Sequence, residues 1–240
     1  MNNKLSSSGD TPQLTARVWD LPTRLFHWGL LICIIGAFAS VKAAQKWGPD
    51  AMQWHFYCGY AILTLLLFRI IWGFVGNRYA RFSSFLPNPL AAWRTLRGAA
   101  ASHLGHNALG AWSVYGLLCA LSFQAVTGLM SNDDIVNEGP WVIKISKSLS
   151  DSITGFHKLN EKVIIGLVLL HIAAIVYYKR VKKEPLTRAR VVGDKIVHNQ
   201  LDVSSLSAMD DAPLRFRALV VFVCSAATVW VLVNKAPAWI

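Results

Sequence analysis

The sequence predicts an all-α integral membrane protein: a transmembrane bundle of four helices followed by a fifth, C-terminal transmembrane helix, with the N-terminus inside and the C-terminus outside. Three observations predict this fold. Of the 240 residues, 54% are hydrophobic and 15% are charged, whereas soluble domains carry roughly 25% charged residues. The apolar residues gather in five runs, each close to the length of about 20 residues that spans hydrocarbon. Basic residues are concentrated in alternate segments between these runs.

The five apolar runs are the predicted spans. They cover residues 25–41, 52–75, 109–130, 153–178 and 216–233. The first run follows about two dozen mostly polar residues and has no signal-peptide pattern, so we expect it to be a retained span. The fourth run is strictly apolar only from Val163, and we expect its first turns to lie among the lipid headgroups. The fifth carries Arg217 near its start.

Lysine and arginine set the predicted orientation. Three precede the first span (Lys4, Arg17, Arg24), four separate the second from the third (Arg78, Arg81, Arg94, Arg97), and nine lie between Lys179 and Arg217. The positive-inside rule places these three segments in the cytoplasm. We therefore expect a cytoplasmic N-terminal segment at 1–24, a four-helix core at 25–178, a basic cytoplasmic linker at 179–215, and the fifth helix with the outer C-terminus at 216–240.

Composition argues against two other classes of protein. The net charge of +11 is explained by membrane orientation, so we expect no nucleic-acid partner. The four cysteines lie far apart in apolar stretches without a C-x-x-C pattern. They therefore suggest neither a disulfide framework, a zinc site nor covalently attached c-type haem.

Four of the seven histidines fall within or at the ends of the spans: His27, His55, His157 and His171. An ionisable side chain inside the membrane is energetically costly, so each of these histidines is expected to have a functional or structural role. His157 and His171 are fourteen residues apart on one helix, which separates them by about 21 Å and points them to nearly the same face. With five crossings, His55 and His157 share the outer depth and His27 and His171 the inner depth. We call these the outer pair and the inner pair.

Imidazoles offered from two helices at one depth suit a planar metal macrocycle standing between the helices. The sequence therefore predicts two b-type haems, with His27, His55, His157 and His171 as axial ligands of the haem iron. Two alternatives remain open: polar residues hydrogen-bonded between helices, and a proton relay in a haem-free transporter. A relay requires neither equal depths nor the fourteen-residue spacing, and Glu161, near a span end, is the one acidic residue in the spans.

Arginines near the predicted inner pair are candidate partners for haem propionates, because guanidinium groups pair well with carboxylates. They are Arg24, Arg69, Arg78 and Arg81. The alternative is that these arginines lie at the lipid headgroups and only set the orientation of the chain in the membrane.

His103 and His106 form an H-x-x-H pattern without further ligands, so we expect no metal site there. These two histidines lie close to Asn107 in the sequence, and the alternatives for them are a role at the start of the following helix or in a quinone pocket.

Ordered motifs between residues 17 and 195 carry a resemblance to a known family. They are RVWDLPTRLFHW at 17–28, RIIWGFVGNRYARF at 69–82, GHNALGAW at 105–112, TGLMSNDDI at 127–135, then His157 and His171, and EPLTRARVVGDK at 184–195. Together they resemble the bacterial cytochrome b561 / nickel-iron hydrogenase b-type cytochrome family, a di-haem membrane family. The resemblance implies that the four histidines are haem ligands. The fifth span departs from the family's four-helix core, and we expect it to pack on the bundle or to recruit another subunit.

Iron with two protein ligands has no vacant position for oxygen or substrate, so the expected work is transfer of single electrons. The resemblance implies electron transfer in the bacterial inner (cytoplasmic) membrane, between the quinone pool and a c-type cytochrome or hydrogenase-like enzyme. The chain is then an electron-transfer subunit or a component of a quinone-linked oxidoreductase, with quinone as an exchangeable substrate. The alternatives are a self-sufficient quinone reductase that uses a small reductant such as superoxide, and a haem-free histidine-relay transporter.

Overall fold

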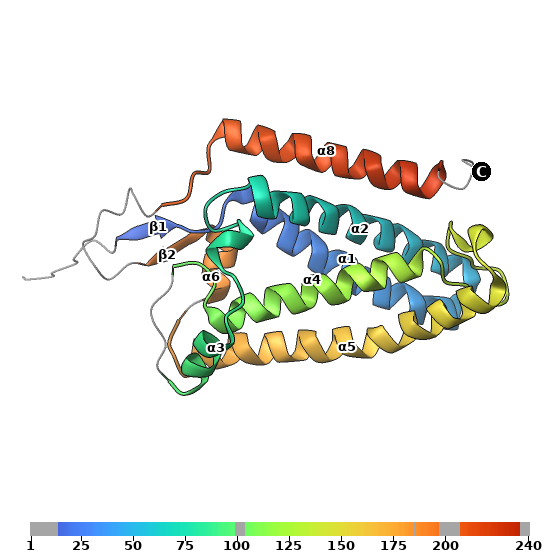
Figure 1. The fold of residues 1–240 in the computed structure, drawn as a ribbon, viewed down its shortest axis with the longest axis horizontal. Helices are drawn as coiled ribbons and strands as arrows, with labels where there is room; N and C mark the ends of the chain where they lie inside the picture. The colour runs from blue at the N-terminus through green and yellow to red at the C-terminus, as the bar shows by residue number, and fades with distance from the viewer. Residues whose placement is uncertain (1–13, 99–103, 185, 197–206, 236–240) are drawn as a thin grey trace, which may run out of the picture.

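Five long helices dominate the computed structural model, which describes residues 14–98, 104–184, 186–196 and 207–235. They are α1 (Leu21–Trp47), α2 (Met52–Val75), α4 (Ala108–Gly128), α5 (Lys147–Arg180) and α8 (Ala212–Asn234). Each is long and apolar enough to cross a membrane, and the five lie side by side with nearly parallel axes (Figure 1). The predicted all-α membrane bundle with a fifth, C-terminal helix is confirmed, while its orientation stays a prediction.

Capping residues explain why several helices extend beyond their apolar runs. Asp20 accepts a hydrogen bond from the Thr23 amide at 2.8 Å and starts α1. Asn107 starts α4 in the same way through the Gly110 amide at 2.7 Å, which is the helix-entry role considered for this segment. The helix α5 begins at Lys147, before the expected residue 153, because Ser146 caps it. These side chains accept amide hydrogen bonds that would otherwise be unmade in the first turn.

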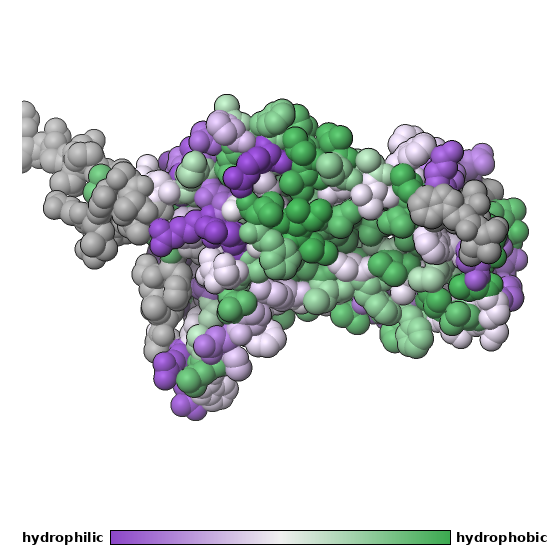
Figure 2. Space-filling view, turned by 45° about the horizontal axis from the view of Figure 1, so that its top comes forward, coloured by the Kyte–Doolittle hydropathy of each residue, from purple (hydrophilic) through white to green (hydrophobic). Residues whose placement is uncertain are grey.

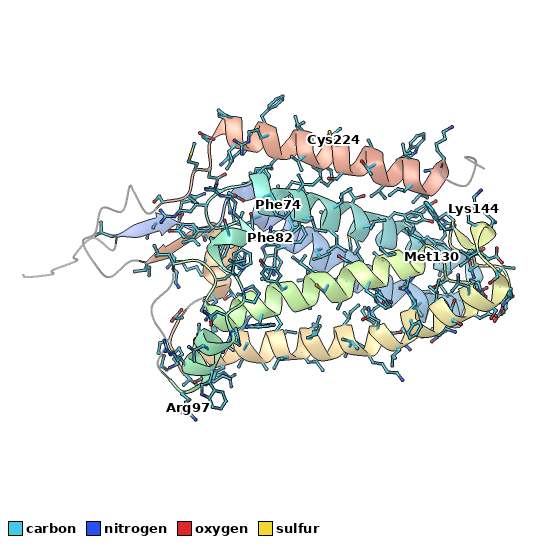
Figure 3. The ribbon with its side chains drawn as sticks, viewed as in Figure 1. Phe74, Phe82, Arg97, Met130, Lys144 and Cys224 are labelled. Carbon is cyan, nitrogen blue, oxygen red and sulfur yellow. The ribbon has the colours of Figure 1, made fainter. Side chains whose placement is uncertain are left out.

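One end of the bundle, which we call the sheet end, carries small additional elements. They are the antiparallel strands β1 (Thr15–Arg17) and β2 (Asp194–Ile196), the 3-10 helix η2 (Phe82–Ser84), and the short helices α3 (Pro89–Leu96) and α6 (Leu186–Val192). Figure 1 shows them at the left, and Arg97 lies there in Figure 3. The segment 179–215, expected as a linker, thus holds α6 and β2. The Asp210 carboxylate ties β1 to α8 by accepting from Arg17 at 2.7 Å and from Arg215 at 3.0 Å.

The opposite end, which we call the loop end, holds two connections. One contains the 3-10 helix η1 (Pro49–Ala51), and the other, residues 129–146, contains η3 (Val142–Lys144). Met130 and Lys144 mark this end in Figure 3. The Asp133 carboxylate folds the second connection by accepting from the backbone amides of Ile135, Val136 and Asn137 at 2.9–3.0 Å. Desolvation by itself would raise the pKa of Asp133. The hydrogen bonds from these amides and from the Asn137 side chain outweigh it and lower the pKa to about 2.

The face of the bundle seen in Figure 2 is apolar along its middle and more hydrophilic at its two ends. Inside, α2 packs against its neighbours through Leu66 and Ile62, which join a cluster with Leu121 of α4 and Ile164 of α5. The indole of Trp72 near the end of α2 is completely buried. The helix α2 therefore lies at the centre of the bundle and contacts each of the helices α1, α4 and α8.

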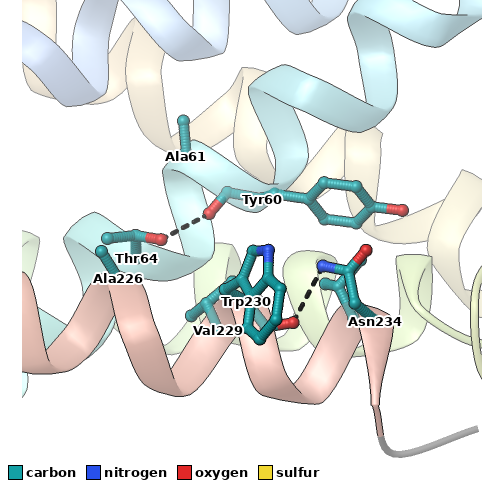
Figure 4. A pocket seen from close by; sticks show the side chains of 8 residues that line it. Tyr60, Ala61, Thr64, Ala226, Val229, Trp230 and Asn234 are labelled. Atoms are coloured by element: carbon teal, nitrogen blue, oxygen red, sulfur yellow. Dashed lines mark hydrogen bonds between the residues drawn. The ribbon is translucent and has the colours of Figure 1, made fainter.

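The fifth helix, α8, packs along α2 on the side away from α5 (Figure 1). At the sheet end Arg217 donates to the Val75 carbonyl at 2.5 Å, and at the loop end the Trp141 indole donates to the Leu232 carbonyl at 3.0 Å. Between the two helices lies a shallow groove of about 210 Å³, lined in part by Tyr60 and Trp230 (Figure 4). The helix is thus fixed at both ends, and it leaves the four histidine-bearing positions of the other helices untouched.

Candidate functional site

The structure brings the two histidines of the outer pair together. His55 of α2 and His157 of α5 have ring centroids 6.4 Å apart and ring planes at 80°. The Nδ1 atom of His55 lies 3.0 Å from the Ala37 carbonyl, and the Nδ1 atom of His157 lies 3.1 Å from the Gln124 carbonyl. A carbonyl can only accept, so both Nδ1 atoms carry the proton and both Nε2 atoms keep a lone pair.

Helix α4 shapes the surroundings of His157. The Thr127 hydroxyl lies 3.1 Å from Nδ1, and the Gln124 side-chain nitrogen lies 3.0 Å from Nε2. A Cβ atom at Gly128 would lie only 3.1 Å from Cε1 of the His157 ring. Glycine at this position therefore leaves the space in which the imidazole rests against α4.

The inner pair lies toward the sheet end. His27 of α1 and His171 of α5 are close enough for His171 to act electrostatically on His27. The Nδ1 atom of His171 lies 3.0 Å from the Ser113 hydroxyl of α4. The Nδ1 atom of His27 is buried and has no hydrogen-bond partner among the described residues. A buried imidazole nitrogen without a partner is costly, so this position favours an additional group that satisfies the ring.

Two buried arginines lie at the sheet end, and one of them, Arg190, acts electrostatically on both His27 and His171. Arg69 is 3% exposed, its guanidinium lies 4.8 Å from the Phe82 ring centroid, and its Nη1 atom has no partner among the described residues. Arg190 of α6 lies 3.7 Å over the Trp19 ring and donates to Nε2 of His106 at 2.9 Å. Burial, helped by the charge of Arg69, lowers the pKa of Arg190 to about 10. Burial and the charge of Arg190 hold the pKa of His106 well below its usual value, so His106 is a neutral acceptor.

The other three candidate arginines are placed differently from Arg69. Arg24 donates to the Val191 carbonyl at 2.7 Å and lies 3.7 Å from the Asp210 carboxylate, so its guanidinium already has partners within the sheet end. Arg78 and Arg81 are exposed, and Arg78 lies 5.7 Å from the Tyr79 ring centroid. Of the four, Arg69 is the buried one.

The donor set fits the haem iron that the sequence suggested. Two metal–nitrogen bonds of about 2 Å each and the half-widths of two imidazole rings add up to roughly 6 Å, which agrees with the 6.4 Å between the rings of His55 and His157. Rings that share one axis through a metal can have any angle between their planes. At the sheet end, the buried Nη1 of Arg69, which has no partner among the described residues, fits an anionic acceptor.

Comparison with known proteins decides the family. The family described as Prokaryotic cytochrome b561 matches residues 18–191, most of the chain. The chain belongs to the prokaryotic cytochrome b561 family. It is therefore a multi-pass b-type cytochrome of the bacterial inner membrane and binds haem b.

Individual relatives of this cytochrome b561 chain are distant. A "Probable Ni/Fe-hydrogenase B-type cytochrome subunit" of Azotobacter chroococcum mcd 1 is 23% identical over 212 residues, covering 75% of this chain and 88% of the relative. A "Probable Ni/Fe-hydrogenase 1 B-type cytochrome subunit" of Escherichia coli (strain K12) is 25% identical over 135 residues, covering 46% and 57%. A "Probable superoxide oxidase CybB" of Yersinia pestis is 27% identical over 171 residues, covering 68% and 89%. No solved structure shows a significant match.

Sequence reasoning missed several residues of this cytochrome that contact the histidines or their neighbours. They are Ser113, Gln124, Thr127, Asn160 and Arg190. Gln124 and Asn160 carried a usable signal, because amide side chains inside spans are rare and usually have a partner. Arg190 could not be separated from the other basic residues between the fourth and fifth spans. His103, the first residue of the H-x-x-H pattern, lies outside the described residues.

Proposed function

We propose that this cytochrome binds two b haems, an outer one between His55 and His157 and an inner one between His27 and His171, and that it carries electrons across the membrane. The observation that carries the proposal is the 6.4 Å separation of the outer rings, which suits two imidazoles on one metal. The fourteen-residue offset on α5 then places the second site about 21 Å away along the helix. Bound haem b supplies a one-electron carrier at each position.

The protein's own groups orient the ligands. The carbonyls of Ala37 and Gln124 hold the Nδ1 protons of the outer histidines, and this keeps protons off the Nε2 atoms that would ligate the metal. The Ser113 hydroxyl contacts Nδ1 of His171. Two protein ligands on each iron leave no vacant position for a substrate, so the sites suit electron passage rather than chemistry on a bound substrate.

Arginines at the sheet end are the proposed partners for the propionates of the inner haem. Arg69 has the strongest support because it is buried and its Nη1 is unpartnered. Arg24 shares its guanidinium with Val191 and Asp210, and the exposed Arg78 and Arg81 have weaker support. Arg190, which stacks on Trp19, is a further cation at this site.

The proposed electron path joins the quinone pool to a redox partner. Relatives named as Ni/Fe-hydrogenase b-type cytochrome subunits support a hydrogenase-like partner, and a c-type cytochrome is the other partner that the sequence suggested. Family membership as a b-type cytochrome sets aside the haem-free transporter. The relative named as a probable superoxide oxidase supports a second candidate, in which superoxide itself reduces the haems and quinone takes the electrons.

The test is a reduced-minus-oxidised optical spectrum of the purified protein in detergent, with pyridine haemochrome quantification of haem per chain. We expect a split b-type α-band and two haems per chain. One haem per chain would contradict the proposal of two sites. Adding a quinol in one sample and a superoxide source in another, and following haem reduction in each, separates the two candidate functions.

A further inference from the structure

Two amide side chains within the spans, Gln124 of α4 and Asn160 of α5, form a buried network beside His157. Asn160 is 9% exposed and lies one helical turn after His157. Its Nδ2 atom donates to Oε1 of Gln124 at 2.8 Å and to the Ala120 carbonyl at 2.9 Å. Asn160 therefore links α4 to α5 at the depth of the outer pair, in a region where an unmade amide hydrogen bond is costly.

The bond from Asn160 fixes which way the Gln124 carboxamide points. Because Oε1 of Gln124 accepts from Asn160, the NH₂ group of Gln124 faces Nε2 of His157 at 3.0 Å and donates to it. The backbone carbonyl of the same residue accepts from Nδ1 of His157. Gln124 thus contacts both ring nitrogens, and the only tautomer consistent with both bonds has its proton on Nδ1 and its lone pair on Nε2.

The histidines of the inner pair have no such network. His171 contacts the Ser113 hydroxyl, which can donate or accept and therefore does not select a tautomer. The buried Nδ1 of His27 has no partner among the residues described. The amide network is thus a specific property of the outer site and not a general way in which this chain holds its histidines.

We propose that Gln124 and Asn160 are positioning residues for His157: their network holds α4 beside the ring and so maintains the Nδ1 hydrogen bond to the Gln124 carbonyl, which sets the ligating tautomer. The carboxamide of Gln124 satisfies the Nε2 lone pair until haem enters and must leave it on ligation. The link from Asn160 to Ala120 keeps α4 and α5 together beside the ring. A hydrogen bond from Nδ1 to a carbonyl raises the basicity of a histidine ligand, so the pair lowers the midpoint potential of the outer haem. This inference rests on the proposed function.

The test compares Asn160→Leu and Gln124→Met with the natural protein, all loaded with haem. In both variants we expect the midpoint potential of the outer haem to rise and its occupancy to fall at least twofold, while the inner haem keeps its band and its potential. The variant Thr64→Val is the matched control, because among the described residues the Thr64 hydroxyl bonds only to the Tyr60 carbonyl of its own helix. It should leave both haems unchanged.

Three outcomes separate the possible failures. If both haems keep their potentials and occupancy in Asn160→Leu and in Gln124→Met, or if both change equally, the positioning role is wrong. A normal inner haem shows that a variant is folded, and Gln124→Met decides the matter if Asn160→Leu does not fold. In a parallel sample, retention of both haems by His157→Ala would overturn the proposed haem ligation itself and not merely the positioning role.

Discussion

The outer and inner pairs each combine one histidine of α5 with one from another helix, yet their surroundings differ. The outer pair is bordered by neutral buried groups, the carbonyls of Ala37 and Gln124 and the amide network of Asn160, and the cation that acts on His157 is the exposed Lys158. The guanidinium group of Arg190 acts on both histidines of the inner pair, and the buried Arg69 and Arg190 both act on His106 close by. In the proposed two-haem protein, the spacing of the histidines sets where the two sites lie, and the neighbouring side chains decide their electronic character.

This contrast predicts an order of potentials. Carbonyl acceptors on Nδ1 make the outer histidines more basic and favour oxidised iron. Nearby cations favour the state with one more electron, so Arg69 and Arg190 raise the potential of the inner haem. We therefore expect the inner haem to have the higher midpoint potential. Without a membrane potential, electrons then pass downhill from the outer to the inner site.

The largest expected effect comes from deleting one ligand of each pair. Replacing His171 by alanine should remove the inner haem and leave the outer one, and replacing His157 should do the reverse, because each iron loses one of its two protein ligands. Haem per chain should fall by about half in each variant, and the component of the split α-band that is lost should differ. Pyridine haemochrome quantification and low-temperature optical spectra measure both effects.

His198→Ala, in the basic segment between the fourth and fifth spans, is the control and should keep both haems. If His171→Ala and His157→Ala lose the same spectral component, the division into two pairs is wrong. If either variant retains its full haem content, that histidine is not a ligand.

A second, smaller effect is expected from the inner cation. Replacing Arg69 by glutamine should lower the midpoint potential of the inner haem by on the order of 1 kcal/mol, or about 40 mV for one electron. The outer haem should not change, because Arg69 lies at the sheet end. Redox titration followed in the α-band measures the shift. An equal shift of both haems would show that Arg69 affects the whole bundle rather than one site.

The sequence was sufficient for the bundle because the membrane leaves so few alternatives. Hydrocarbon requires long apolar helices, so residues 52–75 already defined α2 with its final bounds. The limits of α5 were less predictable, since Ser146 caps it before the apolar run begins. The strands β1 and β2 could not be predicted, because their pairing joins residues almost two hundred positions apart.

The surroundings of the histidines were only partly predictable. Depth and helical spacing suggested that His55 would face His157, and those rings lie together in the structure. Spacing carries no information on which side chains of α4 reach them, so Ser113 and Gln124 were missed. Arg69 was among four equivalent candidates in the sequence, and burial alone distinguishes it.

A third prediction concerns the pH dependence of stability at the sheet end. Asp20 is almost fully buried, and burial raises the pKa of its carboxyl group, with a smaller effect from Asp210. The protonated acid is therefore favoured by folding, and its contribution is present below about pH 4 and lost as the pH rises through the raised pKa. In Asp20→Asn, which retains a capping acceptor for α1, this contribution no longer depends on pH.

Thermal unfolding in detergent across this pH range measures the effect. The natural protein should gain a few degrees relative to Asp20→Asn as the pH falls, and the spectrum of the outer haem should be the same in both. A difference in melting temperature that does not change with pH would mean that Asp20 is not protonated on folding.

The smallest expected effect tests the close packing of His157 against α4. In Gly128→Ala the new methyl group would lie 3.1 Å from Cε1 of the His157 ring, so the imidazole must shift by a few tenths of an ångström. Alanine gains about 1 kcal/mol over glycine in a helix, which offsets the crowding, and we expect little change in stability. The outer haem band should nevertheless shift, since its ligand has moved. Gly116→Ala on the same helix is the control, because its methyl group would meet only Leu167 at 4.0 Å. It should keep both bands, and an identical shift in the two variants would mean that helix α4, and not contact with His157, is responsible.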